Sequence, residues 1–225
     1  MIPYTLTRSR RKTVALYLSE GGVEVRAPLS MPKREIDSFV ASKQNWLIDK
    51  LAQMRERCER RQAFALGYGS ALLYRGAEYP VTAGSTPHAG FDGSAFYLPA
   101  GLSAEQIKAA CVKVYRALAA RHLGERVLAF AGQMNANPAA VKINGAKTRW
   151  GSCSSRKNLN FSWRLIMAED AVIDYVVVHE LAHLTEMNHS ARFWAIVQGV
   201  LPDFRQRKAG LRQLQARLAI ERWDG

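Results

Sequence analysis

The stretch HELAHLTEMNH at residues 179–189 holds three of the five histidines in this 225-residue chain. On a helix, residues four apart lie one above the other, so His179 and His183 can present two imidazole nitrogens to one metal ion. Glu180 points about 100° away from them, beside the position that such an ion leaves open. The spacing therefore predicts a metal-binding helix of the HExxH type.

His189 strengthens this prediction. It lies six residues after His183, which is far enough for the chain to leave the helix, turn near Asn188 and return a third ligand. Three protein nitrogens and one water make up a catalytic zinc site, so we expect one zinc ion per chain.

Three carboxylates compete with His189 as the third ligand. Glu186 would lie about one turn past His183, at an angle that misses the metal, and Asp203 and Glu221 are more distant candidates. The six-residue spacing equals that of the metzincins, but Glu186 occupies their glycine position and no methionine turn follows. We therefore favour His189, without assigning the chain to that clan.

The residues before the motif indicate a buried helix. Residues 171–184 are apolar on every side, and histidines and a glutamate inside such a helix are costly unless a metal pairs with them. The β-branched run at 176–178 would also fit a strand, but a strand would turn Glu180 away from the two histidines. If the segment is a helix, Glu180 can accept a proton from a water molecule while that water attacks a carbonyl group. Glu180 can then pass the proton to the leaving amine.

The rest of the chain mixes strands and helices, which predicts an α+β fold. Ser103 and Gln106 form a capping box that opens a helix reaching to about Met134, with Gly124 as a possible interruption. The other predicted helices cover 32–61, 170–187, about 190–202 and a basic final segment with Leu211, Leu214 and Leu218 on one side. The predicted strands cover 13–18, 23–27, 71–75, 79–83, 95–98 and two or three segments of 140–166, of which LNFSWRLI at 159–166 is the strongest.

We expect two regions within one compact molecule. Residues 1–100 form a β-rich N-terminal region with one long helix, and residues 101–225 form the catalytic region. The length of the chain allows either one large domain or two small ones.

Composition excludes several classes of protein. With 48% hydrophobic and 23% charged residues, the chain is typical of a folded globular protein and not of a disordered or fibrous one. No apolar run reaches the 18 or so residues of a membrane span, so we expect no membrane contact. Three widely spaced cysteines and no recognisable secretory signal indicate a reduced, cytoplasmic protein.

Lys and Arg number 32 against 19 Asp and Glu, a net charge of +13. This surplus makes acidic partners plausible, among them nucleotides and nucleic acids. Residues 1–66 carry 13 of the basic residues, without the interleaved aromatic residues of a single-strand binding platform.

Five segments together resemble the YgjP-like metallopeptidases, which are related to the SprT-like group: RWGSCS at 149–154, LNF at 159–161, IDYVVVHELAH at 173–183, NHS at 188–190 and FW at 193–194. The resemblance implies a zincin-like α+β metallopeptidase domain. It also implies a zinc ion held by His179, His183 and His189, with Glu180 as the catalytic acid and base.

Other side chains receive secondary roles. Arg149 and Arg164 are candidates for stabilising an oxyanion, although surface or supporting roles are favoured. Trp150 and Trp163 are expected in the core. Asp174 is expected to face away from the metal, because its five-residue offset from His179 places it on the far side of the helix.

Three functions follow. The first is a zinc-dependent peptidase that binds a peptide or protein substrate, with a strand near 158–165 pairing with the extended peptide. The second is a metal-dependent hydrolase of nucleotide phosphoanhydrides, a pyrophosphatase. The third is a nucleic-acid-associated protease or binding module, whose affinity would fall steeply with salt. The oligomeric state is left open.

Overall fold

The computed structural model describes residues 2–19 and 21–223 and confirms the mixed α+β class. The chain divides into two compact units, Met1–Phe64 with Ala219–Glu221, and Ala65–Leu218 with Arg222–Gly225. These units are defined by contacts between residues. The predicted division into an N-terminal region, 1–100, and a catalytic region, 101–225, is a different one, and it stays a prediction. Among the described residues, no helix has the length and apolar content needed to cross a membrane.

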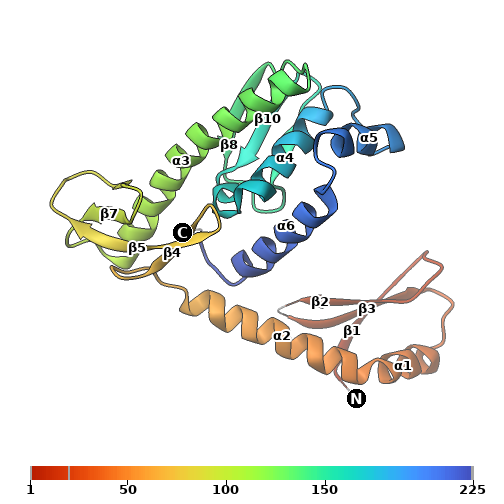
Figure 1. Ribbon diagram of the computed structural model, residues 1–225. Helices are drawn as coiled ribbons and strands as arrows, with labels where there is room; N and C mark the ends of the chain where they lie inside the picture. Colours follow the sequence, from red (N-terminus) through yellow and green to blue (C-terminus); the bar gives the residue numbers. More distant parts are fainter. Residues whose placement is uncertain (1, 20, 224–225) are drawn as a thin grey trace. The chain divides into compact units, whose positions relative to one another are not determined.

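The first unit contains a three-stranded sheet (Figure 1). Strands β2 (Ala15–Ser19) and β3 (Gly22–Pro28) correspond to the strands predicted at 13–18 and 23–27, and they form an antiparallel hairpin. Strand β1 (Tyr4–Ser9) pairs in parallel with the other side of β3, so β3 is central. β1 was not among the predicted strands, because its alternating run YTLTRS contains few strongly apolar residues.

Two helices cover this sheet where one was predicted over 32–61. Helix α1 (Lys33–Ser42) ends at Lys43, and α2 (Gln44–Ala63) begins directly after it. The apolar spacing continues across this break, so periodicity alone does not reveal it. The helices and the sheet share one core, made of Val23, Val25, Ala27, Ile36, Val40 and Leu47.

The second unit begins with a four-stranded sheet in the order β4-β5-β7-β6. Its strands are β4 (Ala71–Tyr74), β5 (Ala77–Gly84), β6 (Gly90–Phe91) and β7 (Phe96–Pro99). The prediction located three of the four strands and missed the two-residue β6.

Helix α3 (Ala104–Gln133) runs through 30 residues, and Gly124 does not interrupt it. The predicted capping box is present: the Ser103 hydroxyl accepts a hydrogen bond from the Gln106 backbone N–H, and the Gln106 side chain accepts one from the Ser103 N–H. The helix packs against both the 3₁₀ helix η1 (Trp163–Met167) and helix α4 (Asp170–Ala182).

A second small sheet lies beside α4, with strands β8 (Ala140–Asn144), β9 (Gly151–Cys153) and β10 (Asn158–Ser162). β10 is central, parallel to β8 and antiparallel to β9. The strand predicted through residue 166 is wrong beyond Ser162, because residues Trp163–Met167 form a 3₁₀ helix, η1. All five of its side chains are buried, so core packing and not strand pairing accounts for this apolar run.

Three helices complete the unit: α4 (Asp170–Ala182), α5 (Ala191–Val200) and α6 (Phe204–Leu218). Helix α4 lies between α3 and α6 (Figure 1) and also contacts α5 and β9. It is buried on nearly every side, as predicted, but it ends at Ala182 and not near 187. The next residues form tight turns in which the Leu184 and Thr185 N–H groups donate to the carbonyls three residues earlier.

Candidate metal centre

His179 and His183 lie at the C-terminal end of α4. His179 is in the last turn of the helix, and His183 follows it as the capping residue, still with helical backbone angles (φ −66°, ψ −16°). The helical trace therefore keeps the two rings on one face, with their centroids 5.0 Å apart. Because the helical backbone angles continue to His183, the end of α4 at Ala182 does not change the predicted placement of His179 and His183 on one face.

His189 returns to the same place after the turn. Its Nε2 lies 3.1 Å from Nε2 of His179, and each of the three histidines contributes a ring nitrogen to a group lying within 4.8 Å. The return does not use a left-handed residue at Asn188, since its φ is not positive. Instead, the Asn188 side-chain oxygen accepts a hydrogen bond from the Ser190 N–H, and Ser190 in turn caps α5.

The nitrogens in this group suit a metal ion. Two zinc–nitrogen bonds of about 2.05 Å at a tetrahedral angle place their nitrogens about 3.3 Å apart, close to the spacing of His179 and His189. Nδ1 of His183 lies 3.1 Å from the Glu186 carbonyl oxygen, to which it can donate a hydrogen bond. That bond leaves Nε2 of His183 with the lone pair that a metal requires.

Aromatic side chains surround the histidines. The Phe193 ring centroid lies 4.5 Å from that of His183, and Trp194 stacks on His189 at 5.7 Å. Phe204 in turn stacks against Trp194, with ring centroids 5.4 Å apart. These contacts restrict the rotation of the imidazole rings and so maintain their convergence.

The surroundings of His179 and His189 favour the neutral form that binds metals. Burial is the main cause that lowers the pKa of His179 to about 3, and the charges of His183, His189 and Lys208 add to it. Burial also lowers the pKa of His189, followed by the same two neighbours, His183 and Lys208. Neutral imidazoles close together are the usual state of a histidine metal site.

Glu180 lies on the adjacent face of α4, against β9. Its side chain is 5% exposed, and its Oε2 has no hydrogen-bond partner among the described residues. Burial raises the pKa of this carboxyl to about 7, and the charge of Arg149 opposes that rise. A carboxyl with a pKa near neutrality can both accept and release a proton at pH 7.

A cleft of about 190 Å³ contains both His179 and Glu180. Its walls come from β9 and the residue before it, from α4 and from α6, and they comprise Trp150, Gly151, Tyr175, Val176, His179, Glu180 and Leu211. Sequence reasoning missed Gly151, Tyr175 and Leu211. Of these, Tyr175 could have been found, since it lies four residues before His179 and therefore on the same face of the helix.

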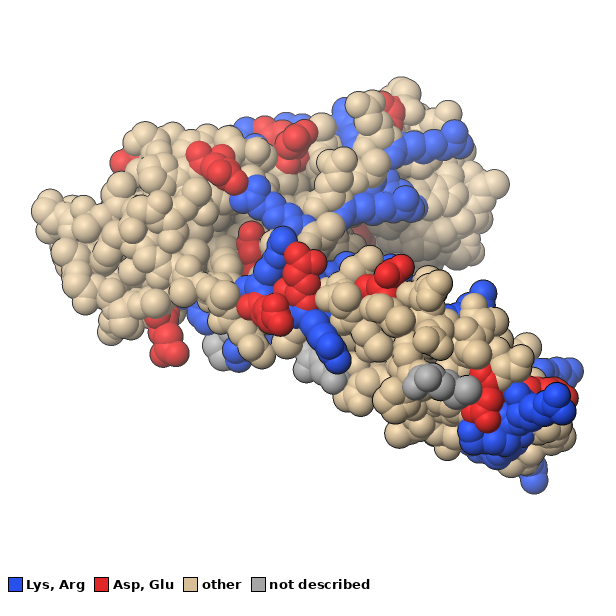
Figure 2. Space-filling view, turned by 90° about the horizontal axis from the view of Figure 1, so that it is seen from below, with Lys and Arg blue, Asp and Glu red and all other residues tan. Residues whose placement is uncertain are grey.

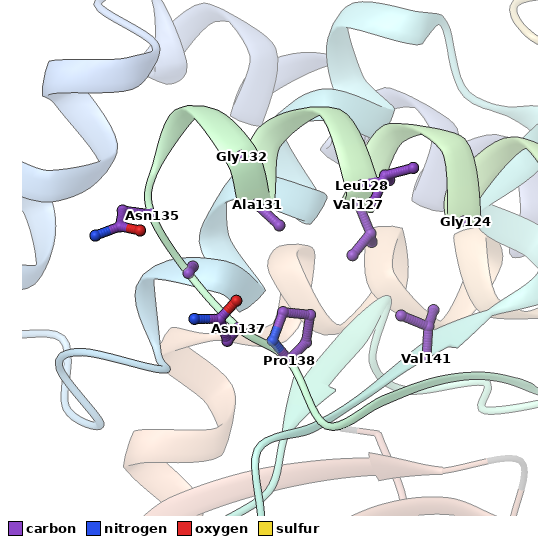
Figure 3. A pocket seen from close by; sticks show the side chains of 10 residues that line it. Gly124, Val127, Leu128, Ala131, Gly132, Asn135, Asn137, Pro138 and Val141 are labelled. Carbon is purple, nitrogen blue, oxygen red and sulfur yellow. The ribbon is translucent and has the colours of Figure 1, made fainter.

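A larger hollow of about 480 Å³ lies elsewhere, between the C-terminal half of α3 and the segment leading into β8 (Figure 3). Glycine, alanine, asparagine and apolar side chains line it, and none of these titrates near neutral pH. Despite its size, it has no acid, base or nucleophile for chemistry. The smaller cleft beside the histidines is therefore the candidate active site.

No carboxylate among the described residues joins the three histidines. Glu186 contributes its backbone carbonyl to His183, and Asp203 forms an ion pair with Arg207 at 2.9 Å. Among the described residues, the histidines therefore cluster without Glu186, Asp203 or Glu221, and their assignment as metal ligands stays a prediction.

The other singled-out residues have mainly structural contacts. Asp174 accepts two hydrogen bonds from Arg126, at 2.6 and 2.9 Å, so it faces away from the histidines as predicted. Arg164 is buried, donates to the Gly145 carbonyl and lies over the Trp163 ring. Trp163 is in the core, whereas Trp150 lines the cleft.

A helix that presents two histidines and a glutamate, joined by a third histidine in an α+β fold, defines a metal-dependent hydrolase of the HExxH class. A family model described as "YgjP-like, metallopeptidase domain" matches residues 12–214. The chain belongs to this YgjP-like metallopeptidase family, which confirms the resemblance and the predicted class of enzyme. Family membership also implies a metal cofactor and a peptide or protein substrate.

Two solved structures of archaeal metallopeptidase zymogens show a weaker likeness. Abylysin of Pyrococcus abyssi is 21% identical, with a TM-score of 0.38, over 43% of this chain and 94% of that one. Jannalysin of Methanocaldococcus jannaschii is 18% identical, with a TM-score of 0.37, over 40% of this chain and 94% of that one. Similarity at this level supports no argument about activity. No curated protein matches the chain.

Proposed function

We propose that the protein is a zinc-dependent peptidase in which His179, His183 and His189 hold one zinc ion and Glu180 moves the proton. The observation that carries this proposal is the convergence of three imidazoles, one of which, His179, lines a cleft together with the buried carboxyl of Glu180. All four residues come from the region 101–225, which we therefore propose as the catalytic region.

A bound zinc ion supplies Lewis acidity, which polarises a carbonyl group and lowers the pKa of water. Glu180 is placed to accept a proton from the attacking water, and its buried carboxyl is then placed to donate that proton to the leaving amine. The raised pKa of Glu180 makes its carboxylate a stronger base, which favours the first of these transfers, and its value of about 7 still allows the proton to be released at neutral pH.

The sheet beside the cleft suggests how an extended substrate binds. The strand predicted for this role lies near 158–165, but β10 is central and both of its edges are already paired. β9 is an edge strand of the same sheet, and its Gly151 lines the cleft. We therefore propose that the peptide adds to the outer edge of β9, which is how extended peptides commonly bind exposed sheet edges.

The state of the cysteines supports a reducing compartment. Cys58, Cys111 and Cys153 are all unpaired in the structure. Secreted proteins of this size commonly use cysteines in disulfides, so we propose a cytoplasmic location.

The catalytic assignment is tested with zinc-loaded wild type and Glu180→Gln on a panel of quenched fluorescent peptides and unfolded proteins. Wild type is expected to cleave peptide bonds, and Glu180→Gln to lose about 10²- to 10⁴-fold in rate while it retains zinc. Undiminished cleavage by the variant would remove Glu180 from the mechanism. Nucleoside triphosphates are assayed in parallel for release of phosphate or pyrophosphate, and turnover of these without peptide cleavage would overturn the peptidase assignment.

A further inference from the structure

The basic residues of α6 fall into two sets. Arg207 pairs with Asp203 at 2.9 Å and with Asp174 at 3.7 Å, and Arg217 donates to Glu78 at 2.6 Å. Arg205, Lys208 and Arg212, by contrast, have no carboxylate partner among the described residues, and the Arg205 guanidinium lies over the Phe204 ring. On the face of the molecule shown in Figure 2, acidic side chains lie among the basic ones in several places.

Two of these three cations, Lys208 and Arg212, flank the candidate active site. Leu211 lines the cleft, and Lys208 and Arg212 lie three residues before it and one residue after it on the same helix. Residues four apart share a helix face, so Lys208 and Arg212 are neighbours on the side of α6 that borders the cleft.

Contacts define the position of Lys208 more closely. Its Nζ lies 5.2 Å from the centroid of the Trp194 ring, which stacks on His189 and lies 5.9 Å from the His179 ring. Lys208 is half-buried, so its charge is less screened than that of a fully exposed lysine. This ammonium group therefore lies on the His189 side of the cleft.

Positive charge also borders the other side of the cleft. Arg149 directly precedes the cleft residues Trp150 and Gly151, and its charge acts on Glu180. Glu180 is the only carboxylic acid among the cleft-lining residues. Since Glu180 is assigned to proton transfer, no acidic group in this cleft is left to balance Lys208, Arg212 and Arg149.

We propose that the cleft selects peptides that carry an aspartate or glutamate within two residues of the scissile bond, and that Lys208 and Arg212 bind this carboxylate. A partly enclosed cleft with cations and no free acid attracts a negatively charged group and repels a positively charged one. This inference rests on the proposed peptidase function and identifies its substrate class.

The test compares matched peptides that differ only at the residues flanking the bond, with Glu, Gln or Lys at those positions. For wild type, kcat/KM is expected to be about tenfold higher for the Glu peptide than for the Gln peptide, and lowest for the Lys peptide. In the double variant Lys208→Glu and Arg212→Glu, this order is expected to reverse, and in wild type the preference should shrink as salt is added.

A matched control is Lys113→Glu, an exposed charge reversal on α3 outside the cleft. It should keep the wild-type order of the three peptides, and zinc content is measured for every variant. Equal kcat/KM for the Glu and Gln peptides, or a preference that survives in the double variant, would overturn the assignment of Lys208 and Arg212 without affecting the peptidase assignment.

A binding measurement separates this proposal from the catalytic one. Fluorescence anisotropy of labelled Glu and Gln peptides is followed on zinc-loaded Glu180→Gln protein, with and without the Lys208→Glu change. Tighter binding of the Glu peptide that depends on Lys208 supports the selectivity, even where wild type cleaves none of the peptides and the peptidase assignment fails. Equal binding of both peptides overturns the selectivity.

Discussion

Gly151 and Glu180 are in such close contact that a β-carbon added to Gly151 would lie 2.6 Å from Oε1 of Glu180. The same atom would lie 2.8 Å from the carboxyl carbon Cδ, and real β-carbons do not approach other heavy atoms so closely. The edge strand β9 and the helix α4 can therefore hold the carboxyl between them only if residue 151 has no side chain.

We predict that Gly151→Ala displaces Glu180 and lowers kcat by at least about tenfold, because small displacements of a catalytic group cost large factors in rate. The three atoms nearest to the added methyl group all belong to Glu180 and none to a histidine, so zinc content should stay at the wild-type value. Steady-state kinetics and metal analysis on the same preparation measure both quantities.

Gly199→Ala is the matched control for this substitution. Gly199 lies in α5, and a β-carbon there would have no neighbour within 4 Å. In a helix, alanine is favoured over glycine by roughly 0.5–1 kcal/mol, so this variant should be active and slightly more stable. A Gly151→Ala enzyme with wild-type kcat would show that Glu180 does not depend on this contact.

Asp174 is predicted to stabilise the unit and to have no part in catalysis. It is 13% exposed and holds Arg126 through two hydrogen bonds. Asp174→Asn leaves this guanidinium without its counter-charge and should lower the free energy of unfolding by about 2 kcal/mol, less than for a fully buried pair. Urea denaturation followed by tryptophan fluorescence measures the loss.

Asp203→Asn is the comparison for Asp174→Asn. Asp203 is about half exposed and pairs with Arg207 one helical turn away. Such pairs contribute roughly 0.3–0.5 kcal/mol, so this variant should unfold almost like wild type. Equal losses for the two variants would contradict the role assigned to Asp174.

Asp170 makes stability depend on pH. Hydrogen bonds from the Arg75 guanidinium, supported by His122, hold the pKa of its carboxyl below the ordinary value of 3.8. A carboxyl with a lowered pKa in the folded state contributes its stability above the unfolded pKa, and that stability is lost as pH falls through the folded value. Asp170→Asn should therefore cost about 1 kcal/mol at pH 7 and progressively less below about pH 4.

Urea titrations of wild type and Asp170→Asn at a series of pH values test this expectation. The two curves of unfolding free energy against pH should converge as the solution becomes acidic. A difference that stays constant from pH 7 to pH 3 would mean that ionisation of Asp170 does not contribute to stability.

Trp223 closes the core of the second unit. It is 7% exposed, and its ring meets those of Tyr115 and Trp163 edge to face, at 5.5 and 5.7 Å. Trp223→Ala would leave a large cavity and should lower the free energy of unfolding by about 3–5 kcal/mol. A loss below 1 kcal/mol in a urea titration would show that the chain beyond α6 does not support this core.

The candidate metal centre could be predicted largely because its information is local. His179, Glu180 and His183 need only helical backbone to take their relative positions, and the structure supplies it. His189 can reach the other two histidines only if the chain turns after α4, and the sequence allows such a turn without specifying its geometry. The predicted turn at Asn188 was correct in place and wrong in mechanism, since a side-chain hydrogen bond replaces left-handed backbone.

The parts that could not be predicted depend on contacts between segments far apart in the chain. Gly151 gave no local signal of its contact with Glu180, because strand β9 is only three residues long and meets α4 through the fold. Lys208 and Arg212 looked like the other cations of a basic helix, and only their position beside the cleft residue Leu211 in the fold distinguishes them. Most of the segment at 163–167 was predicted as a strand, although it forms a 3₁₀ helix. The two are hard to distinguish in the sequence, because a buried strand and a buried 3₁₀ helix both consist mainly of apolar residues.

The central claim is that three histidines hold one zinc ion. The most direct measurement is metal content per chain, made on protein purified without chelators or a histidine tag, for wild type and for His189→Ala. We predict about one zinc per wild-type chain and a clear loss of zinc in the variant. Wild-type protein that contains no zinc and takes none up on titration, or a variant that binds zinc as tightly as wild type, would contradict the account.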